Sequence, residues 1–100
     1  MVEDPIVTLT TDFGTRDGYV GAMAGVILSR CPNARIHHVA HDIPRGDIVA
    51  GGWAVGNAWR WFPPETIHVI VVDPGVGSDR REILARVSGR TFIAPDNGIV

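Results

Sequence analysis

The apolar positions of this chain gather in short runs that are rich in β-branched residues. Residues 6–10 (IVTLT) lie between Pro5 and a polar Thr-Asp pair, a pattern typical of a buried strand. Residues 35–39 (RIHHV) predict a second strand. Residues 66–72 (TIHVIVV) are apolar on both faces, as expected for a central parallel strand. The pattern therefore predicts three strands that can share one sheet.

Apolar side chains recur at helical spacing in the two stretches between these strands. Residues 18–30 predict a helix that follows Asp17, a candidate N-cap, and ends before Pro32. Residues 48–61 predict a second helix after Asp47, another candidate N-cap. Its apolar stripe recurs at steps of four and three residues and comprises Ile48, Gly52, Val55, Trp59 and Phe62.

Two further runs, residues 82–87 and 90–94, predict a β-hairpin that turns at Ser88-Gly89. The order strand, helix, strand, helix, strand and hairpin predicts the α/β class, as a layered domain with a mostly parallel central sheet. A chain of 100 residues allows one domain at most. Residues 97–100 lead from a turn into an apolar segment, so we expect residues 1–100 to be a fragment of a longer protein.

Composition narrows the class of protein. With 45% hydrophobic and 20% charged residues, the chain resembles a globular domain and not a disordered one. The net charge is −2 and all nine basic residues are Arg, so nothing indicates a nucleic-acid partner or a P-loop Lys. The single Cys31 excludes a disulfide framework and a Cys-rich zinc site. Because the sequence has no apolar run of 18 residues and no signal-peptide layout, we expect a cytoplasmic protein without a membrane partner.

Carboxylates follow three of the predicted strands directly. Asp12, Asp73 and Asp96 each come after an apolar run, and ligands of open α/β sheets bind beyond the carboxyl ends of the strands. The residues alone leave two interpretations open, since such Asp side chains serve turns and caps as well as ligands. Asp73 and Arg80 bracket one tight, glycine-rich loop, so they can form an ion pair that positions a water molecule.

The histidines give a weaker signal. His37 and His38 point to opposite faces of their strand, so at most one of them faces a given site. We interpret both of them and His41 as hydrogen-bonded or surface residues and not as metal ligands. His68 lies within the central strand and is interpreted as a core histidine with a hydrogen-bond partner.

Glycines at positions 18, 21 and 25 lie inside the first predicted helix, where they lower the helix propensity. Their spacing does not match the dinucleotide-binding pattern G-x-G-x-x-G. We interpret them as permitting a close approach of this helix to the sheet, in preference to direct contact with a ligand.

Three segments together are similar to one enzyme family. Residues 10–21 (TTDFGTRDGYVG), 71–78 (VVDPGVGS) and 94–98 (APDNG) resemble the S-adenosyl-L-methionine hydroxide adenosyltransferases, a family that also contains S-adenosyl-L-methionine-dependent fluorinases and chlorinases. The motifs occur in the order and spacing of the family and cover essentially the whole chain. Members of the family continue into a second, β-barrel domain. The resemblance thus implies that residues 1–100 are the N-terminal portion of the substrate-binding α/β domain, and that the barrel is absent from this chain.

The resemblance also implies the chemistry. Water or hydroxide attacks the ribose C5′ of S-adenosyl-L-methionine in line with the sulfonium, and the products are adenosine and L-methionine. S-adenosyl-L-methionine is the substrate, so no cofactor and no metal is expected. A homotrimer is implied for the full-length protein.

Site residues follow from the same motifs. Asp12 matches the residue that accepts hydrogen bonds from the ribose hydroxyls, and a carboxylate can accept two donors at once. Asp73 and Arg80 match two members of a set that holds the attacking water, whose third member, a His, lies beyond residue 100 in the family. For Asp17 the N-cap and the ligand-binding interpretations compete. The substrate-binding positions implied by the resemblance are Asp12, Phe13, Asp17, Asp96 and Asn97.

Three alternatives stay open. The halogenases resemble this chain but carry Tyr in place of Asp73 and Thr in place of Val76. A buried carboxylate would repel a halide ion, so Asp73 favours the hydroxide-using branch over a halogenase. A Mg²⁺-dependent hydrolase could instead use Asp12, Asp73 and Asp96 as oxygen ligands. The third alternative is an inactive fragment that binds nucleosides only.

Overall fold

Five segments pair into one sheet in the computed structural model, which describes residues 4–73, 81–97 and 99. The strands are β1 (Ile6–Thr11), β2 (Arg35–Ala40), β3 (Ile67–Val71), β4 (Glu82–Val87) and β5 (Arg90–Pro95). Their order across the sheet is β2-β1-β3-β5-β4. All neighbours are parallel except β4 and β5, which form the expected antiparallel hairpin. The predicted α/β class with a mostly parallel sheet is confirmed, and β3 is the central strand.

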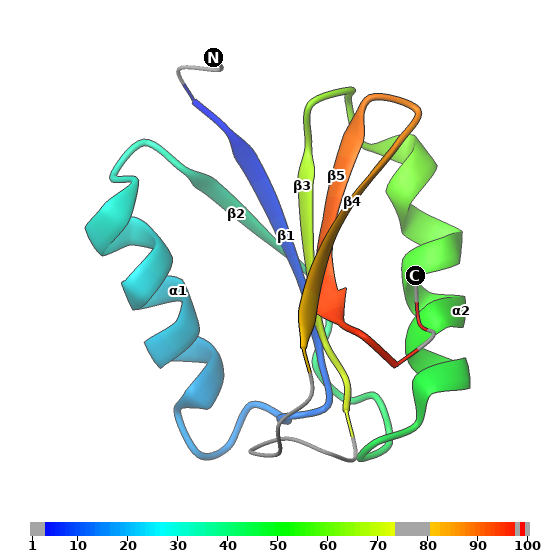
Figure 1. Ribbon diagram of the computed structural model, residues 1–100. Helices are drawn as coiled ribbons and strands as arrows, with labels where there is room; N and C mark the ends of the chain where they lie inside the picture. Colours follow the sequence, from blue (N-terminus) through cyan, green and yellow to red (C-terminus); the bar gives the residue numbers. More distant parts are fainter. Residues whose placement is uncertain (1–3, 74–80, 98, 100) are drawn as a thin grey trace.

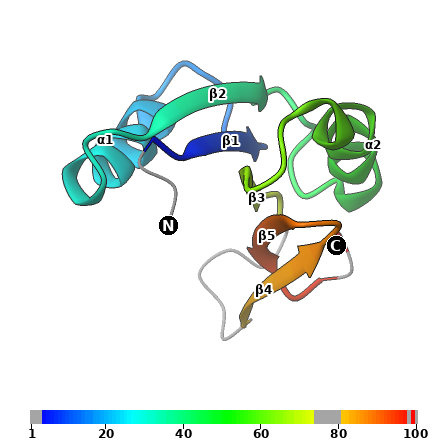
Figure 2. The same ribbon diagram turned by 90° about the horizontal axis from the view of Figure 1, so that it is seen from above.

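Two helices connect the first three strands and cover opposite faces of the sheet (Figures 1 and 2). They are α1 (Tyr19–Arg30) and α2 (Ile48–Ala58), and a 3-10 turn, η1 (Trp59–Trp61), extends α2. Both helices lie where the periodicity predicts them. Within the described residues, no helix is long and apolar enough to cross a membrane.

Helix α2 packs closely on the sheet. The Asp47 side chain accepts a hydrogen bond from the Ala50 backbone N–H at 3.0 Å, which confirms the predicted N-cap. The buried positions of this helix are Gly51 and Val55, so the predicted stripe is right at Val55 and one residue off at Gly52. Val55 joins a core formed with residues of the loop before α2 and of strands β3 and β5. The other buried members are Ile43, Ile70, Val72, Phe92 and Ala94.

Helix α1 departs from the sequence-based prediction at its start. Its N-cap is Gly18, whose φ of 79° and ψ of 2° lie in the left-handed region, and it has no side-chain capping bond. The N-cap prediction for Asp17 is therefore wrong, because the left-handed Gly18 separates the Asp17 side chain from the free N–H groups of the first turn. A Cβ added at Gly21 or Gly25 would meet nothing within 4 Å. The interpretation of these glycines as close-packing residues is also wrong for the described part of the chain.

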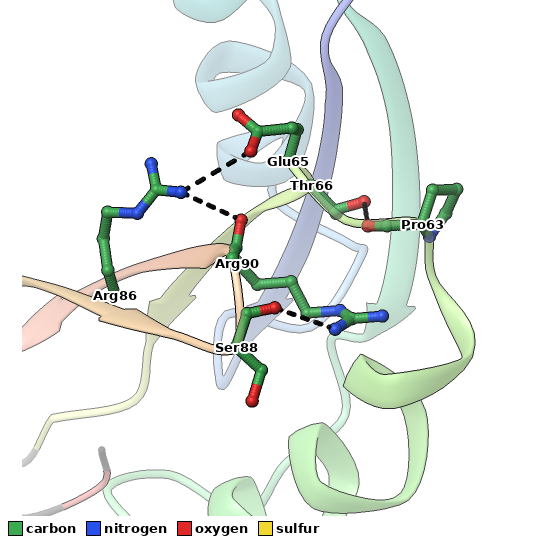
Figure 3. Close-up of polar contacts among 7 residues, drawn as sticks. Pro63, Glu65, Thr66, Arg86, Ser88 and Arg90 are labelled. Carbon is green, nitrogen blue, oxygen red and sulfur yellow. Dashed lines mark hydrogen bonds and ion pairs between the residues drawn. The ribbon is translucent and has the colours of Figure 1, made fainter.

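The amino-terminal edge of β3 is tied to the β4–β5 turn by polar contacts (Figure 3). Ser88 and Gly89 both have positive φ, 52° and 81°, as a tight two-residue hairpin turn requires. The Arg86 guanidinium lies 3.5 Å from the Glu65 carboxylate and donates to the Gly89 carbonyl at 3.2 Å, while Arg90 donates to the Ser88 carbonyl at 3.1 Å. These contacts stabilise the edge of the sheet that lies opposite the strand ends carrying the predicted site residues.

Candidate active site

The predicted site residues follow the carboxyl ends of three neighbouring strands. Asp12 follows β1, Asp73 lies two residues after β3, and Asp96 follows β5. Because β1, β3 and β5 are adjacent and parallel, their ends meet at one edge of the sheet, the lower edge in Figure 1. The topology therefore brings these segments to one edge, as the sequence predicts.

Asp12 is held from two sides. Its carboxylate Oδ2 accepts a hydrogen bond from the Gly46 backbone N–H at 2.7 Å, and its own N–H donates to the Val71 carbonyl at 3.3 Å. Gly46 has a φ of 70° and lies in the loop that precedes α2. A backbone N–H on a carboxylate is a strong, directional contact. Among the described residues no hydrogen bond reaches the other oxygen, Oδ1, so it can accept a donor from a diol.

A chain of hydrogen bonds lies beside the Asp12 segment. The Thr11 hydroxyl is hydrogen-bonded to His41 Nδ1 at 2.8 Å, and His41 Nε2 is hydrogen-bonded to His38 Nδ1 at 2.7 Å. Burial and the neighbouring His38 lower the pKa of His41, against a smaller opposing effect of Asp42. The interpretation of His38 and His41 as hydrogen-bonded residues is confirmed. Their contact was not foreseen, because residues three apart at the end of a strand are not expected to lie on the same face.

Asp73 is the most buried of the three carboxylates, with 6% of its surface exposed. It follows Val72, whose carbonyl accepts a hydrogen bond from Asn97 Nδ2 at 2.8 Å, so the end of β3 is fixed by the segment that follows β5. Arg80, its predicted partner, lies outside the described residues.

Asp96 and Asn97 form the turn after β5. The Asp96 carboxylate pairs with the Arg81 guanidinium at 2.7 Å, on the solvent-exposed side of the molecule. Asn97 Oδ1 accepts a hydrogen bond from the Ile99 N–H at 3.1 Å. The amide of Asn97 thus joins two segments. Its role in substrate binding stays a prediction.

The loop between β1 and α1 carries the two remaining predicted residues. Phe13 is half-buried and its ring centroid lies 6.2 Å from that of Tyr19. Asp17 is exposed and, within the described residues, makes no hydrogen bond. Neither contact pattern tests their predicted role in substrate binding.

The carboxylates do not gather into a metal site. Among residues 4–73, 81–97 and 99, no three His, Cys, Asp or Glu side chains lie close enough together to hold one metal ion. Asp12, Asp73 and Asp96 are all described, so their geometry does not support the Mg²⁺ alternative. A groove of about 210 Å³ lies elsewhere, between α2 and β5, and its lining includes Trp59 and Phe92 but none of the predicted site residues.

Comparison with known proteins agrees with the motifs. Residues 7–100 match the family model described as the SAM hydroxide adenosyltransferase N-terminal domain. An (R)-S-adenosyl-L-methionine hydrolase of Methanocaldococcus jannaschii is 44% identical over 94% of this chain, and one of Salinispora arenicola is 38% identical over all of it. A fluorinase of an Actinoplanes species is 30% identical over 84% of the chain.

A solved structure gives the same result for the fold. An uncharacterized conserved protein of Thermotoga maritima superposes with a TM-score of 0.88 at 34% identity, and the match covers 95% of this chain and 36% of that one. The chain spans 37% and 38% of the length of the two hydrolases named above. The family model, the identities and the shared fold lead to one conclusion: the chain belongs to the S-adenosyl-L-methionine hydroxide adenosyltransferase family.

Proposed function

We propose that the full-length protein hydrolyses S-adenosyl-L-methionine to adenosine and L-methionine. The observation that carries this proposal is Asp73, a buried carboxylate at the edge of the sheet where the carboxyl ends of β1, β3 and β5 meet. Relatives named as S-adenosyl-L-methionine hydrolases, matched along nearly the whole chain, support the same reaction. A buried negative charge repels a halide ion but can accept a hydrogen bond from water, which favours hydrolysis over halogenation.

The reaction is a substitution at the ribose C5′. The water oxygen forms a bond to C5′, the C5′–S bond breaks with its electron pair going to sulfur, and one proton is released. L-methionine leaves as a neutral thioether, so no general acid is needed at the leaving group. Catalysis then depends on orientation and on the position of the nucleophile. Asp73, together with Arg80, is proposed to hold the attacking water.

Substrate binding is assigned to the β1 end. Asp12 is proposed to accept hydrogen bonds from the ribose hydroxyls, supported by its fixed carboxylate and the acceptor capacity that remains beside the Gly46 contact. Phe13, Asp17, Asp96 and Asn97 are proposed to line the same pocket.

The remaining features of the protein are proposals of the same kind. The chain is proposed to be the N-terminal portion of a longer, cytoplasmic protein that acts as a homotrimer. The share of the curated relatives that it spans supports the longer protein. The reaction is proposed to need no cofactor, because both the nucleophile and the leaving group are supplied by water and substrate.

Chromatography of the products tests the reaction. The full-length protein is incubated with S-adenosyl-L-methionine, with and without chloride. Adenosine and L-methionine are expected in both samples, and Asp73→Asn should lower kcat by at least about 100-fold. A 5′-halo-5′-deoxyadenosine formed faster than adenosine, or no product at all, would overturn the proposal.

Calorimetry with adenosine tests the role of Asp12. Asp12→Ala should weaken adenosine binding by about tenfold or more, because the ribose hydroxyls lose a charged acceptor. Asp4→Ala is the matched control, since Asp4 is an exposed carboxylate at the start of β1, at the opposite edge of the sheet. Equal affinities of wild type and Asp12→Ala would show that the ribose role is wrong.

A further inference from the structure

His41 contacts the Asp12 segment twice, from a different element of the fold. Its ring Nδ1 is hydrogen-bonded to the Thr11 hydroxyl at 2.8 Å, and its backbone carbonyl accepts the Gly14 N–H at 2.7 Å. The Thr11 hydroxyl also accepts the Phe13 N–H at 3.2 Å. Thr11 and Gly14 are thus bound directly to one histidine, which is 8% exposed, and Phe13 is linked to it through the Thr11 hydroxyl.

The ring nitrogens of His41 are both used. A neutral imidazole has one donor and one acceptor, and His41 meets Thr11 with one nitrogen and His38 with the other. In the tautomer in which Nδ1 accepts a hydrogen bond from the Thr11 hydroxyl, Nε2–H donates to His38. The Thr11 oxygen then still has a lone pair that accepts the Phe13 N–H. The groups that face the ring are therefore Thr11 of β1, His38 of β2 and the adjacent Asp42. A buried side chain with every polar atom paired is held in one orientation.

This arrangement leaves Asp12 little freedom. Its backbone N–H is bound to the end of β3, the two following N–H groups are bound directly or through Thr11 to His41, and its carboxylate is bound to Gly46. Without the His41 ring, the Thr11 hydroxyl loses the contact that orients it and keeps only the Phe13 N–H. The Asp12 carboxylate would then sample several positions, and a carboxylate that binds a diol must be fixed to a fraction of an ångström.

We propose that His41 is a positioning residue for the reaction: it fixes residues 11–14 so that the Asp12 carboxylate meets the ribose hydroxyls. The proposal rests on the proposed function, because it takes ribose binding by Asp12 as the step that is served. It assigns to the ring a role in substrate affinity and not in the attack of water.

Steady-state kinetics of the full-length protein with S-adenosyl-L-methionine test it. His41→Leu should raise KM about tenfold while kcat changes less than about threefold, because binding and not chemistry is impaired. His41→Asn keeps a polar atom at the place of Nδ1, so its KM should stay within about threefold of the wild type. Thr11→Val removes the same hydrogen bond by deleting the hydroxyl, so its KM and kcat should change as predicted for His41→Leu. This variant tests the proposal independently if His41→Leu folds poorly. His37→Asn is the control, because His37 lies on β2, the strand that leads to His41, and packs against Phe62 instead.

Amide hydrogen exchange separates this proposal from the proposed function. The Phe13 and Gly14 amides should exchange at least about tenfold faster in His41→Leu and Thr11→Val than in wild type, with His41→Asn close to wild type. Unchanged exchange of these amides would overturn the positioning role whether or not the protein turns over substrate. A wild-type KM in His41→Leu, or a His41→Asn variant as impaired as His41→Leu, would overturn it too. Absence of turnover in the wild type, with the exchange differences intact, would instead contradict the proposed function alone.

Discussion

At the scale of single residues, His68 is the most unusual polar group of the core. Its ring is 2% exposed, lies between Phe62 and Phe92, and is hydrogen-bonded to the Thr8 hydroxyl through Nδ1 at 2.7 Å. Its Nε2 has no hydrogen-bond partner among the described residues. Burial, with a smaller contribution from Arg90, lowers its pKa below 6.5, so the folded protein holds it in the neutral form.

This neutral histidine makes stability depend on pH. Below about pH 6.5 the unfolded chain binds a proton that His68 in the folded chain does not bind, so stability falls as the pH falls. His41, whose pKa is also lowered, acts in the same direction. The loss starts near pH 6.5 and continues down to the folded-state pKa, at no more than about 1.4 kcal/mol per pH unit for each histidine. Urea unfolding of the full-length protein between pH 5 and about pH 8 measures this slope.

Variants of His68 test whether this residue causes the pH dependence of the unfolding free energy. His68→Leu should flatten the pH dependence of the unfolding free energy, although it costs about 1–3 kcal/mol because the Thr8 hydroxyl loses its partner. The double variant Thr8→Val/His68→Leu removes that unpaired hydroxyl and should recover part of the stability while keeping the reduced pH dependence, with the contribution of His41 remaining. A wild-type slope in both variants would contradict the argument.

At the scale of elements, α2 approaches the sheet at a glycine. A Cβ at Gly51 would lie 2.9 Å from Ile99 Cδ1 and 3.2 Å from Val72 Cγ2, and Val72 is fully buried. At Gly56 in the same helix, a Cβ would meet nothing within 4 Å. The two positions share a helix and differ in packing, so they form a matched pair.

Alanine should therefore have different effects on stability at these two positions. Gly56→Ala should stabilise the full-length protein by up to about 1 kcal/mol through helix propensity. Gly51→Ala gains the same propensity but presses on Val72, so it should be less stable than Gly56→Ala by about 1–2 kcal/mol. Thermal unfolding of the two variants measures the difference, and equal stabilities would show that α2 does not pack tightly at Gly51.

The elements also show what the sequence predicts and what it leaves undetermined. β-branched runs and helical spacing predict the position of each strand and α-helix in the described part of the chain, because these patterns reflect burial on one or two faces. Asp47 and Asp17 look equally good as N-caps, yet only Asp47 caps a helix, since a left-handed Gly18 precedes α1. No local pattern indicates that Gly18 adopts this conformation.

For the candidate site, too, the sequence predicts some features and leaves others undetermined. Strand order can be inferred from right-handed connections, so the shared edge of Asp12 and Asp73 is predictable from the pattern of elements. The partner of the Asp12 carboxylate is not, because Gly46 lies 34 residues further along the chain and contributes only its backbone N–H. The contacts of Thr11 with His41 depend likewise on how two loops meet in three dimensions.

At the scale of the whole molecule, the described surface carries several large, exposed apolar side chains. No residue of α1 within the described chain is buried, and large apolar side chains are exposed on both helices and on β4. Val49 and Trp53, one turn apart on α2, are 72% and 65% exposed. Neighbouring exposed apolar side chains of this kind are typical of an interface. Because the chain spans only 37% and 38% of two related hydrolases, we expect other parts of the full-length protein to cover this face.

A double polar substitution tests this expectation, because it should have different effects in residues 1–100 alone and in the full-length protein. In a polypeptide of residues 1–100 alone, Val49→Ser/Trp53→Ser removes exposed apolar area, so binding of a hydrophobic dye should fall while secondary structure stays unchanged. In the full-length protein the same side chains are expected to be buried, so the double variant should be less stable by about 3 kcal/mol or more. Dye fluorescence of the short chain and thermal unfolding of the full-length protein measure the two effects. If the substitutions leave the stability of the full-length protein unchanged, this face of α2 is exposed there as well, and the apolar surface needs another occupant, such as a second copy of the protein.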